Sequence, residues 1–314
     1  MKNIMWVCQT YVTIYFFGWL LLIFVAFAFI IFNMEVVTVT NKYNGKKLNT
    51  FILDNLPFIT QNTLYKLLRK KDIKVNNKRV NTNVTIHTGD IISVYISYSN
   101  LLQIVYEDDN ILVVNKPTKL EVTGTNSLTS LVHKKYNSSS FQYMPCHRLD
   151  RNTTGLVLFA KNKTALDILN KKFKNHEIEK HYLALVYGIP KKETLKMEAY
   201  LFKDSKKSLV YISDSFKKGY KKIITYYNII KRYENSSVLD VQIETGRTHQ
   251  IRAHLAHIGH PIIGDGKYGI NKINKEFGSK FQQLVAYKLV FNFKTDSGIL
   301  NYLNNKTISI NCTF

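Results

Sequence analysis

Acidic residues are scarce in this chain. Its 314 residues hold 22 Asp and Glu against 44 Lys and Arg, which gives a formal net charge of +22. The basic residues are spread along the chain rather than gathered in one tail. An excess of this size is typical of proteins that bind polyanions such as nucleic acids, although a solvated lysine-rich surface would explain many single lysines. The length allows one large domain or two of ordinary size.

Cysteine is also scarce. Cys8, Cys146 and Cys312 are far apart, so they form neither a disulfide framework nor a Cys-x-x-Cys metal site. This usage favours a reducing compartment. There is no internal repeat, and residues 137–140 are the only patch of low complexity.

The N-terminal segment, residues 1–34, lacks charge after Lys2. Its core, YVTIYFFGWLLLIFVAFAFIIF, is long enough for a transmembrane helix and long for a signal peptide. Three lysines follow it closely, so an inserted helix would tether the rest of the chain on the cytoplasmic side. A second explanation is that Met34 is the true start of the protein. Both explanations stay open, and both place the functional part in the cytoplasm.

Residues 35–97 are expected to form a small α/β domain. Two helices are predicted near residues 46–56 and 61–71, the second capped by Thr60, and short strands follow. The stretch LLRKKDIKVNNKRVNTNVTIHTGDII resembles the S4-like RNA-binding domain. The resemblance implies that basic residues near the end of the second helix contact RNA, and a solvated helix face is the alternative. These residues are Lys66, Arg69, Lys70 and Lys71.

In residues 98–314 strand and helix patterns alternate irregularly. VYEDDNILVVNKP reads as two strands around a polar turn, SLTSLVHKKY and KTALDILNKKFKN as amphipathic helices, and HYLALVYG and SSVLDVQI as strands. This order favours an α+β fold with a mixed sheet over a doubly wound parallel one.

One acid stands between two arginines in HRLDRNTTGLVLFA. Asp150 precedes an apolar strand, with Arg148 and Arg151 beside it, and nearby positive charge favours the ionised carboxylate. Loops that lead into rigid strands are common places for reacting groups. Taken alone, however, an aspartate between arginines is more often part of a surface ion pair.

A second basic stretch is ETGRTHQIRAHLAHIGHPIIGDGKYG. It predicts a helix capped by Thr248 and ended by Gly259, with Arg247 and Arg252 at its start. Cations are unfavourable at a helix N-terminus, so an anion is expected there, either Asp150 or an RNA phosphate. The histidines of this stretch suggest a metal site only weakly, because the run has no Cys, no H-E-x-x-H and one nearby carboxylate, Asp265. They are His249, His254, His257 and His260.

Four stretches taken together carry a family resemblance. VYEDDNILVVNKP, HRLDRNTTGLVLFAKN, KHYLALVYG and TGRTHQIRAHLAHIGHPIIGDGKYG occur in this order within residues 100–292 and are similar to RluA-type pseudouridine synthases. The resemblance implies a catalytic domain with a mixed, largely antiparallel sheet that acts on RNA as a monomer, without metal or cofactor. One departure is Leu284-Val285-Ala286, where relatives often have Leu-His-Ala.

The resemblance also assigns roles. It implies that Asp150 is the catalytic aspartate, Tyr182 the active-site tyrosine, and Arg252 the basic partner that holds the carboxylate. A target uridine must be flipped out of folded RNA. Arg148 matches the family arginine near the flipped nucleotide, and His147, Arg151 and Arg247 are expected RNA contacts. Ribosomal RNA of the large subunit is the expected substrate; a tRNA or dual-specificity synthase, or a non-catalytic ribosome-assembly factor, is the alternative.

Overall fold

The computed structural model describes residues 34–96, 101–137 and 140–314, and the chain divides into two compact units between Ser99 and Asn100. The expected boundary at residue 97 falls in the short segment that is not described. The expected apolar segment lies outside the described residues except for Met34. Within the described part of the chain, no helix is long and apolar enough to cross a membrane.

The smaller unit is an antiparallel sheet with two helices beside it. Both expected helices are present, and the Thr60 hydroxyl accepts a hydrogen bond from the Thr63 amide as the predicted N-cap. The short strands expected after the second helix are also present. The sheet order is β1-β4-β2-β3. The elements are β1 (Met34–Thr38), η1 (Asn41–Tyr43), α2 (Leu48–Asn55), α3 (Gln61–Arg69), β2 (Ile73–Val75), β3 (Lys78–Val80) and β4 (Ile91–Tyr95).

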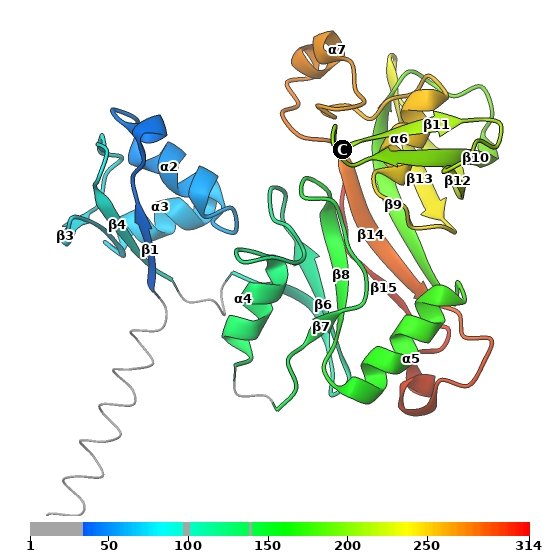
Figure 1. The fold of residues 1–314 in the computed structure, drawn as a ribbon, viewed down its shortest axis with the longest axis horizontal. Coiled ribbons are helices and arrows are strands. Elements are labelled where there is room, and N and C mark those ends of the chain that lie inside the picture. The colour runs from blue at the N-terminus through cyan, green and yellow to red at the C-terminus, as the bar shows by residue number, and fades with distance from the viewer. Residues whose placement is uncertain (1–33, 97–100, 138–139) are drawn as a thin grey trace, which may run out of the picture. The chain divides into compact units, whose positions relative to one another are not determined.

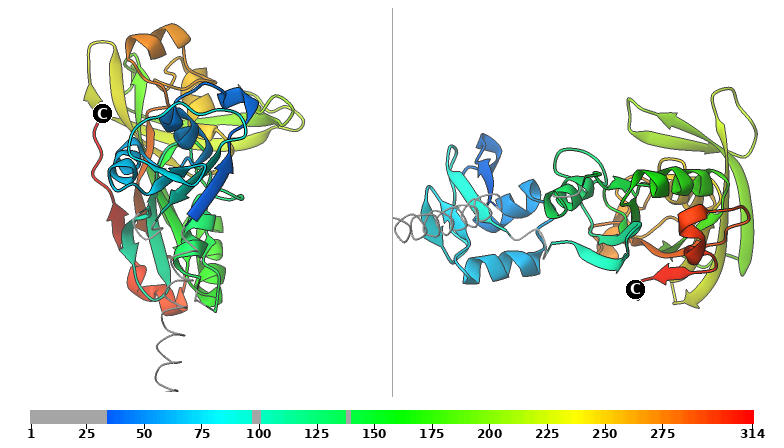
Figure 2. Two further views of the ribbon diagram at one scale, coloured as in Figure 1. Left: turned by 90° about the vertical axis from the view of Figure 1, so that its left-hand side faces the viewer. Right: turned by 90° about the horizontal axis from the view of Figure 1, so that it is seen from below.

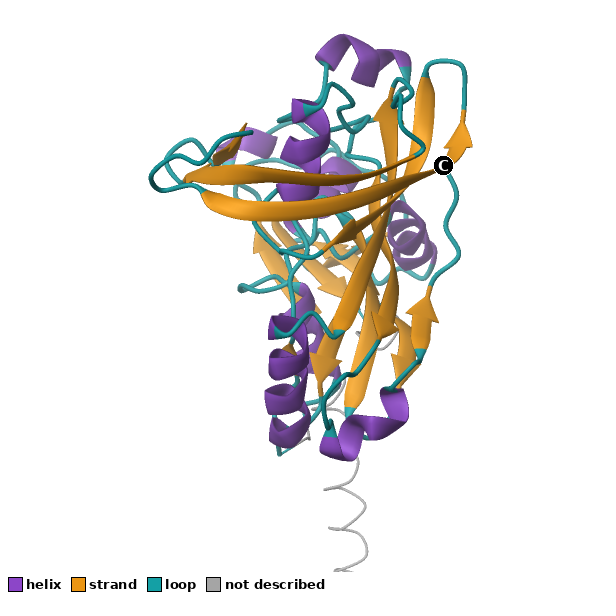
Figure 3. Ribbon diagram, turned by 90° about the vertical axis from the view of Figure 1, so that its right-hand side faces the viewer, coloured by secondary structure: helices purple, strands orange, loops and turns teal. Residues whose placement is uncertain are grey.

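The larger unit is built on one twisted sheet, with eleven strands in the part of the chain that is described (Figure 3). The main path runs β11-β10-β12-β13-β9-β14-β8-β6-β5, and β15 and β7 pair with β14 and β8. All of these pairings are antiparallel except β8 with β14, which confirms the expected mixed, largely antiparallel α+β fold. The strands are β5 (Gln103–Glu107), β6 (Ile111–Lys116), β7 (Met144–Pro145), β8 (Thr154–Ala160), β9 (Ile178–Tyr187), β10 (Thr194–Asp204), β11 (Leu209–Ser213), β12 (Lys221–Arg232), β13 (Ser236–Ile243), β14 (Leu284–Phe291) and β15 (Thr307–Ser309).

Helices cover parts of this sheet (Figure 1). Leu169 of α5 belongs to a buried cluster with Leu158 of β8 and Phe291 of β14. Ala253 of α6 belongs to a second cluster, formed with β10, β11 and β12. The helical elements are α4 (Leu128–Lys135), α5 (Lys163–Lys174), α6 (Gln250–His257), α7 (Asn271–Glu276) and η3 (Gly298–Leu303).

Strand β8 explains the unbroken apolar run that follows Asp150. Leu156 to Ala160 are fully buried, because β8 lies between β6 and β14 and is covered on both faces. Gly155 stands where β14 approaches most closely: a Cβ there would lie 2.2 Å from the Ala286 carbonyl oxygen, and its φ is +113°. Glycine is therefore required at the start of β8. The preceding loop is anchored to this rigid strand.

Candidate active site

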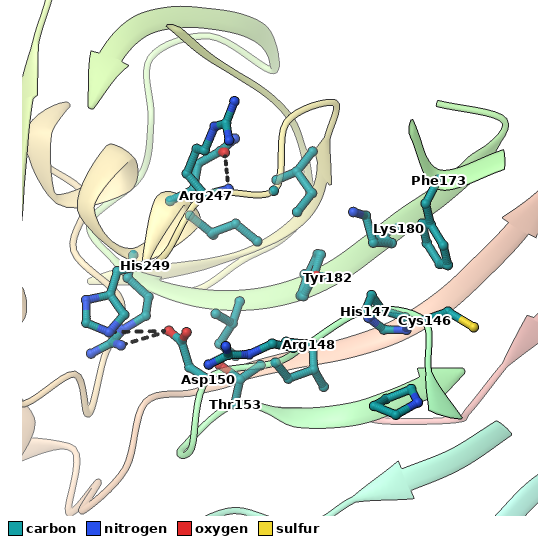
Figure 4. A pocket seen from close by; sticks show the side chains of 18 of the residues that line it. Cys146, His147, Arg148, Asp150, Thr153, Phe173, Lys180, Tyr182, Arg247 and His249 are labelled. Carbon is teal, nitrogen blue, oxygen red and sulfur yellow. Dashed lines mark hydrogen bonds and ion pairs between the residues drawn. The ribbon is translucent and has the colours of Figure 1, made fainter. Parts of the chain in front are cut away.

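A cavity of about 580 Å³ lies in the larger unit, where three segments distant in sequence meet. The β7–β8 loop supplies Asp150 and strand β9 supplies Tyr182 (Figure 4). Helix α6 supplies Arg252. The structure thus brings together the three residues expected to be catalytic. Further lining residues include His147, Arg148, Phe173, Lys180, Arg247 and His249.

The Asp150 carboxylate is held by Arg252. Arg252 Nη1 donates to Asp150 Oδ2 over 2.9 Å, and its Nε and Nη2 donate to the two oxygens of Asp265 over 2.7 and 2.9 Å. Asp265 is fully buried, whereas the Asp150 side chain is 26% exposed. The guanidinium is therefore fixed from behind by one carboxylate and presents its remaining edge to the other. Asp150, one of the two anions expected at the helix start, is thus paired with Arg252.

The charges of this triad are stabilised by one another. Burial opposes the charge of Arg252, yet the hydrogen bonds and charges of Asp265 and Asp150 outweigh it and raise the Arg252 pKa further. Burial likewise raises the pKa of Asp265, but Arg252 and the amides of Lys267 and Tyr268 reverse the effect, so the net pKa is lowered. Arg252 therefore carries its charge throughout the accessible pH range and takes no part in proton transfer.

Strand β9 places two polar side chains on the cavity face. Tyr182 is 5% exposed, and burial, followed by the charge of Asp150, raises its pKa. Its hydroxyl is therefore protonated at neutral pH. Lys180, two residues earlier, lies on the same face because side chains alternate along a strand. Its Nζ lies 5.4 Å from the Phe173 ring centroid, and burial lowers the Lys180 pKa.

His249 lies beside the aspartate on the other side. Its Nδ1 is 2.9 Å from the Tyr268 hydroxyl, and its Nε2 is 3.9 Å from Asp150 Oδ2. Burial lowers the His249 pKa, while the Asp150 charge acts in the opposite direction. The imidazole is therefore neutral near pH 7, with one nitrogen facing the Asp150 carboxylate.

The predicted cap of α6 was wrong. The helix begins at Gln250 and follows His249, whose φ of 54° is left-handed, with no side-chain cap from Thr248. Gln250 replaces the cap: its side-chain oxygen accepts hydrogen bonds from the Thr245 hydroxyl and the Arg247 amide. This buried glutamine fixes the turn that carries Arg247 and His249 into the cavity.

His147 has a structural partner. Its Nε2 accepts a hydrogen bond from the Leu158 amide over 3.1 Å, and its ring lies 5.3 Å from that of Phe173. Burial, and then the charge of Lys180, lowers the His147 pKa to about 3. The imidazole is neutral, so it attaches the β7–β8 loop to β8 and brings no positive charge to a phosphate.

The arginines predicted to contact RNA divide into two groups. Arg148 is exposed and lines the cavity, as does Arg247. Arg151 is exposed but points elsewhere, and its Nε donates to the Lys119 carbonyl over 3.1 Å. The ion pair of Asp150 is made with Arg252, 102 residues away, and not with its two sequence neighbours. The four basic residues expected in the first domain are exposed near the end of α3.

Sequence reasoning missed Lys116, which supports the loop that carries Asp150. It is fully buried, and its Nζ donates to the carbonyls of Pro117, Leu120 and Arg151 over 2.9, 2.7 and 3.1 Å. Burial lowers the Lys116 pKa to about 7, and the charge of Asp150 acts against that fall. The only available signal was the NKP sequence at the end of a buried strand.

Asp265 and Lys180 were also missed as site residues. Asp265 could have been suspected, because it is an acid in an acid-poor chain that follows Arg252 by 13 residues. Lys180 could have been found from the two-residue period that places it on the same face as Tyr182.

The histidines considered as metal ligands take separate partners. His249 bonds to Tyr268, and the other three bond to Thr225, Asp214 and the Tyr187 carbonyl. In residues 34–96, 101–137 and 140–314 there is no group of three or more His, Cys, Asp or Glu arranged to hold a metal ion. The side chains of His254 and His257 thus serve packing and hydrogen bonding.

Comparison with known proteins places this site in a family. The family described as RNA pseudouridylate synthase matches residues 110–257, which include Asp150, Tyr182 and Arg252. A ribosomal large subunit pseudouridine synthase C from Buchnera aphidicola is 30% identical over 312 residues, covering 87% of this chain and 98% of that protein. Its counterpart from Rickettsia bellii is 33% identical, with coverage of 82% and 93%.

A solved structure agrees with these sequences. The structure of human RNA Pseudouridylate Synthase Domain Containing 1 superposes with a TM-score of 0.54 at 27% identity, covering 64% of this chain and 82% of the human one. An uncharacterized RNA pseudouridine synthase from Mycoplasma capricolum is 36% identical over 271 residues, with coverage of 78% and 87%. The chain therefore belongs to the RNA pseudouridine synthases, and it is an isomerase that acts on RNA.

Proposed function

We propose that this synthase converts specific uridines of large-subunit ribosomal RNA to pseudouridine, with Asp150 as the reacting carboxylate. The observation that carries the proposal is the Asp150–Arg252–Asp265 arrangement, in which a fixed guanidinium holds one partly exposed carboxylate at the wall of a nucleotide-sized cavity. The choice of RNA is supported by relatives named as ribosomal large subunit pseudouridine synthases that match nearly full length.

The residues fit the chemistry of the isomerisation. The N1–C1′ bond breaks, the base turns, and C5 bonds to C1′; C5 loses its proton and N1 ends with one, so no group is gained or lost. Asp150 acts on the sugar as a nucleophile or on the base, and Arg252 stabilises its charge without exchanging protons. Tyr182, protonated beside it, offers a ring for stacking and a hydroxyl for proton transfer at C5.

Substrate binding combines a cavity for the target uridine with exposed cations that contact RNA phosphates regardless of sequence. The uridine must leave the RNA stack at a cost of a few kcal/mol, and exposed Arg148 at the cavity is placed to contact the flipped nucleotide or fill the gap. In the S4-like unit, the exposed cations at the end of α3 would contact phosphates, so affinity should fall steeply with salt. We also propose that the enzyme works as a monomer in the cytoplasm, in keeping with its three scattered cysteines.

Pseudouridine mapping of cellular RNA in a strain that lacks the gene tests the proposal. One or a few sites in large-subunit ribosomal RNA should be missing, and should return with the wild-type gene but not with Asp150→Asn or Asp150→Ala. Purified enzyme should restore the same sites in ribosomal RNA prepared from that strain.

Other outcomes are equally informative. Missing sites confined to tRNA would replace the proposed substrate, and missing sites in both classes would indicate dual specificity. If the Asp150 variants restored every site, the carboxylate assignment would be wrong. If no site were lost, the chain would act as a non-catalytic assembly factor.

A further inference from the structure

Strands β10, β11 and β12 form a ribbon at one edge of the sheet (Figure 2). Its two faces carry different side chains. One face is apolar and buried: Ala199, Leu201 and Ile223 pack in a cluster with Ala253 of α6. The apolar face of the ribbon therefore points toward α6, which also carries Arg252. The alternate residues of the same strands form the opposite face, which does not contact α6 and lies away from the cavity.

That second face carries aromatic rings. Phe202 of β10 lies directly opposite Tyr211 of β11 in the strand register, and Tyr200 is on the same face two residues before Phe202. The β11–β12 loop adds two more rings, because Phe216 packs edge-to-face on Tyr200 at 5.6 Å and Tyr220 stacks on Phe202 at 5.4 Å. These five residues are called the aromatic patch below.

The aromatic patch is exposed to an unusual degree. Phe216 is 69% exposed, Tyr211 41% and Phe202 37%. A single exposed aromatic residue needs no explanation, but a cluster held in mutual contact is typical of a binding surface. Because Phe216 contributes so little buried area, the fold gains little from it.

Lysines are frequent in the segment that carries most of the aromatic patch. Lys203 and Lys221 alternate onto the opposite face, and Lys222 pairs with Glu198. The segment from residue 203 to residue 222 contains seven lysines and two aspartates. Asp204 accepts a hydrogen bond from the Lys207 amide, and Asp214 pairs with His257. The lysines are all exposed and consist of Lys203, Lys206, Lys207, Lys217, Lys218, Lys221 and Lys222.

We propose that the aromatic patch binds unpaired nucleotides of the RNA substrate outside the catalytic cavity. This inference rests on the proposed function, because it treats the partner as the RNA that the enzyme modifies. Exposed rings offer stacking faces for any base, and the lysines follow the phosphates, which is the combination that binds single strands without sequence preference. A duplex would satisfy only the lysines, since its bases are already stacked. A purely apolar partner would leave the positive charge without a counterpart.

Binding of a fluorescently labelled 12-nucleotide oligouridylate to the full-length protein tests the inference. Phe216→Ala should weaken binding about tenfold, within the range of base–aromatic stacking. The control Ile230→Ala removes a side chain of similar exposure, 51%, from β12 beyond the aromatic patch and should change affinity by less than about twofold. A 12-base-pair RNA duplex should bind both variants alike, because it offers no free base faces.

Lysines are tested in the same assay. The double variant Lys217→Ala, Lys218→Ala should have a shallower slope of log affinity against log salt concentration. The expected change in slope is about 1.4, which corresponds to two phosphate contacts on a single strand. The control Lys231→Ala removes a lysine from β12. It should leave unchanged the difference in oligouridylate affinity between wild type and Phe216→Ala. Oligouridylate carrying 4-thiouridine should crosslink under ultraviolet light to the peptide that contains Phe216.

Equal affinity of wild type and Phe216→Ala for the oligouridylate would overturn the inference. So would binding to vesicles of phosphatidylserine and phosphatidylcholine that Phe216→Ala abolishes while oligouridylate binding stays intact, since the aromatic patch would then serve a membrane. Neither readout depends on catalysis. A different result is that the wild-type enzyme forms no pseudouridine while Phe216→Ala still weakens oligouridylate binding. The proposed function would then be wrong, but binding of unpaired nucleotides by the aromatic patch would be supported.

Discussion

Arg252 Nη1 donates a hydrogen bond of 2.9 Å to Asp150 Oδ2, although 102 residues separate the two. The same guanidinium is fixed from behind by fully buried Asp265. The Asp150 carboxylate is therefore positioned by an anchored cation and not by the arginines beside it in sequence. This relationship ties the loop before β8 to the start of α6.

Asp150→Asn should reduce pseudouridine formation at least about 10³-fold, because the amide is neither a nucleophile nor a base. Arg252 keeps its two bonds to Asp265, so the melting temperature should change little. Single-turnover assays on ribosomal RNA, with binding measured separately, check this. Asp240→Asn is the matched control, since its side chain has a similar exposure, 21% against 26%, and bonds to His181. Loss of activity in both variants would indicate a general effect on the fold.

Asp265→Asn should cost both stability and rate. Replacing a buried carboxylate that pairs with an arginine is expected to lower the free energy of unfolding by about 3 kcal/mol. Below the melting temperature, kcat should fall while RNA affinity holds, because Arg252 no longer holds Asp150 in one place. The same change at Asp167, whose pair with Lys163 is exposed, should cost less than about 0.5 kcal/mol. An unchanged kcat in folded Asp265→Asn would contradict the positioning role.

Tyr182→Phe distinguishes the contribution of the Tyr182 ring from that of its hydroxyl. The ring packs as before, so RNA affinity and melting temperature should stay close to wild type. The rate should fall about 10²-fold or more if the hydroxyl transfers a proton. Tyr227→Phe is the control, because Tyr227 is 4% exposed and its hydroxyl donates to the Lys192 carbonyl away from the cavity. Full activity in Tyr182→Phe would limit this residue to stacking.

The buried carboxylate of Glu177 predicts how the free energy of unfolding depends on pH. Burial raises its pKa, but hydrogen bonds from Lys172, the Lys294 amide and Thr295 outweigh that effect and lower the pKa from 4.5 to about 2. A carboxyl with a lowered folded-state pKa stabilises the protein above pH 4.5, and this contribution is lost as the pH falls toward 2. Urea unfolding at pH 6 and at pH 3 should show that Glu177→Gln differs from wild type far more at pH 6.

The control for that experiment is Glu193→Gln, because Glu193 is exposed in its pair with Arg232. Its difference from wild type should be small at both pH values. A Glu177→Gln difference that stays constant from pH 6 to pH 3 would mean that the buried pair with Lys172 does not titrate in this range.

Local patterns predicted most elements, and the family resemblance selected three residues that the fold brings to one cavity. The apolar run after Asp150 indicated a buried strand, and β8 is buried on both faces. The start of α6 was mispredicted, because capping rules favoured Thr248 whereas the fold uses the side chain of Gln250. A short-range rule cannot anticipate a glutamine that is fixed by β12, where the Ile224 carbonyl accepts its amide hydrogen.

The residues that the sequence could not reveal act through long-range contacts. Lys116 supports the loop that carries Asp150 by donating to the Arg151 carbonyl, 35 residues away. The NKP sequence at the end of a buried strand is the only local signal, and it does not reveal this distant partner. The aromatic patch was missed for a similar reason: only the register of β10 with β11 and the return of the following loop bring Phe202, Tyr211 and Phe216 together.

A truncated variant that begins at Met34 should fold and modify RNA. It keeps β1, which pairs with β4 over five residues, and buried Val39, whose amide donates to the Asp90 carbonyl. A variant that begins at Thr40 loses both and leaves β4 as an unpaired edge, so its smaller unit should unfold at lower temperature and aggregate more readily. Circular dichroism melts and RNA modification compare the two. If the Met34 variant fails to fold or to modify RNA, the apolar segment is a working part of the protein.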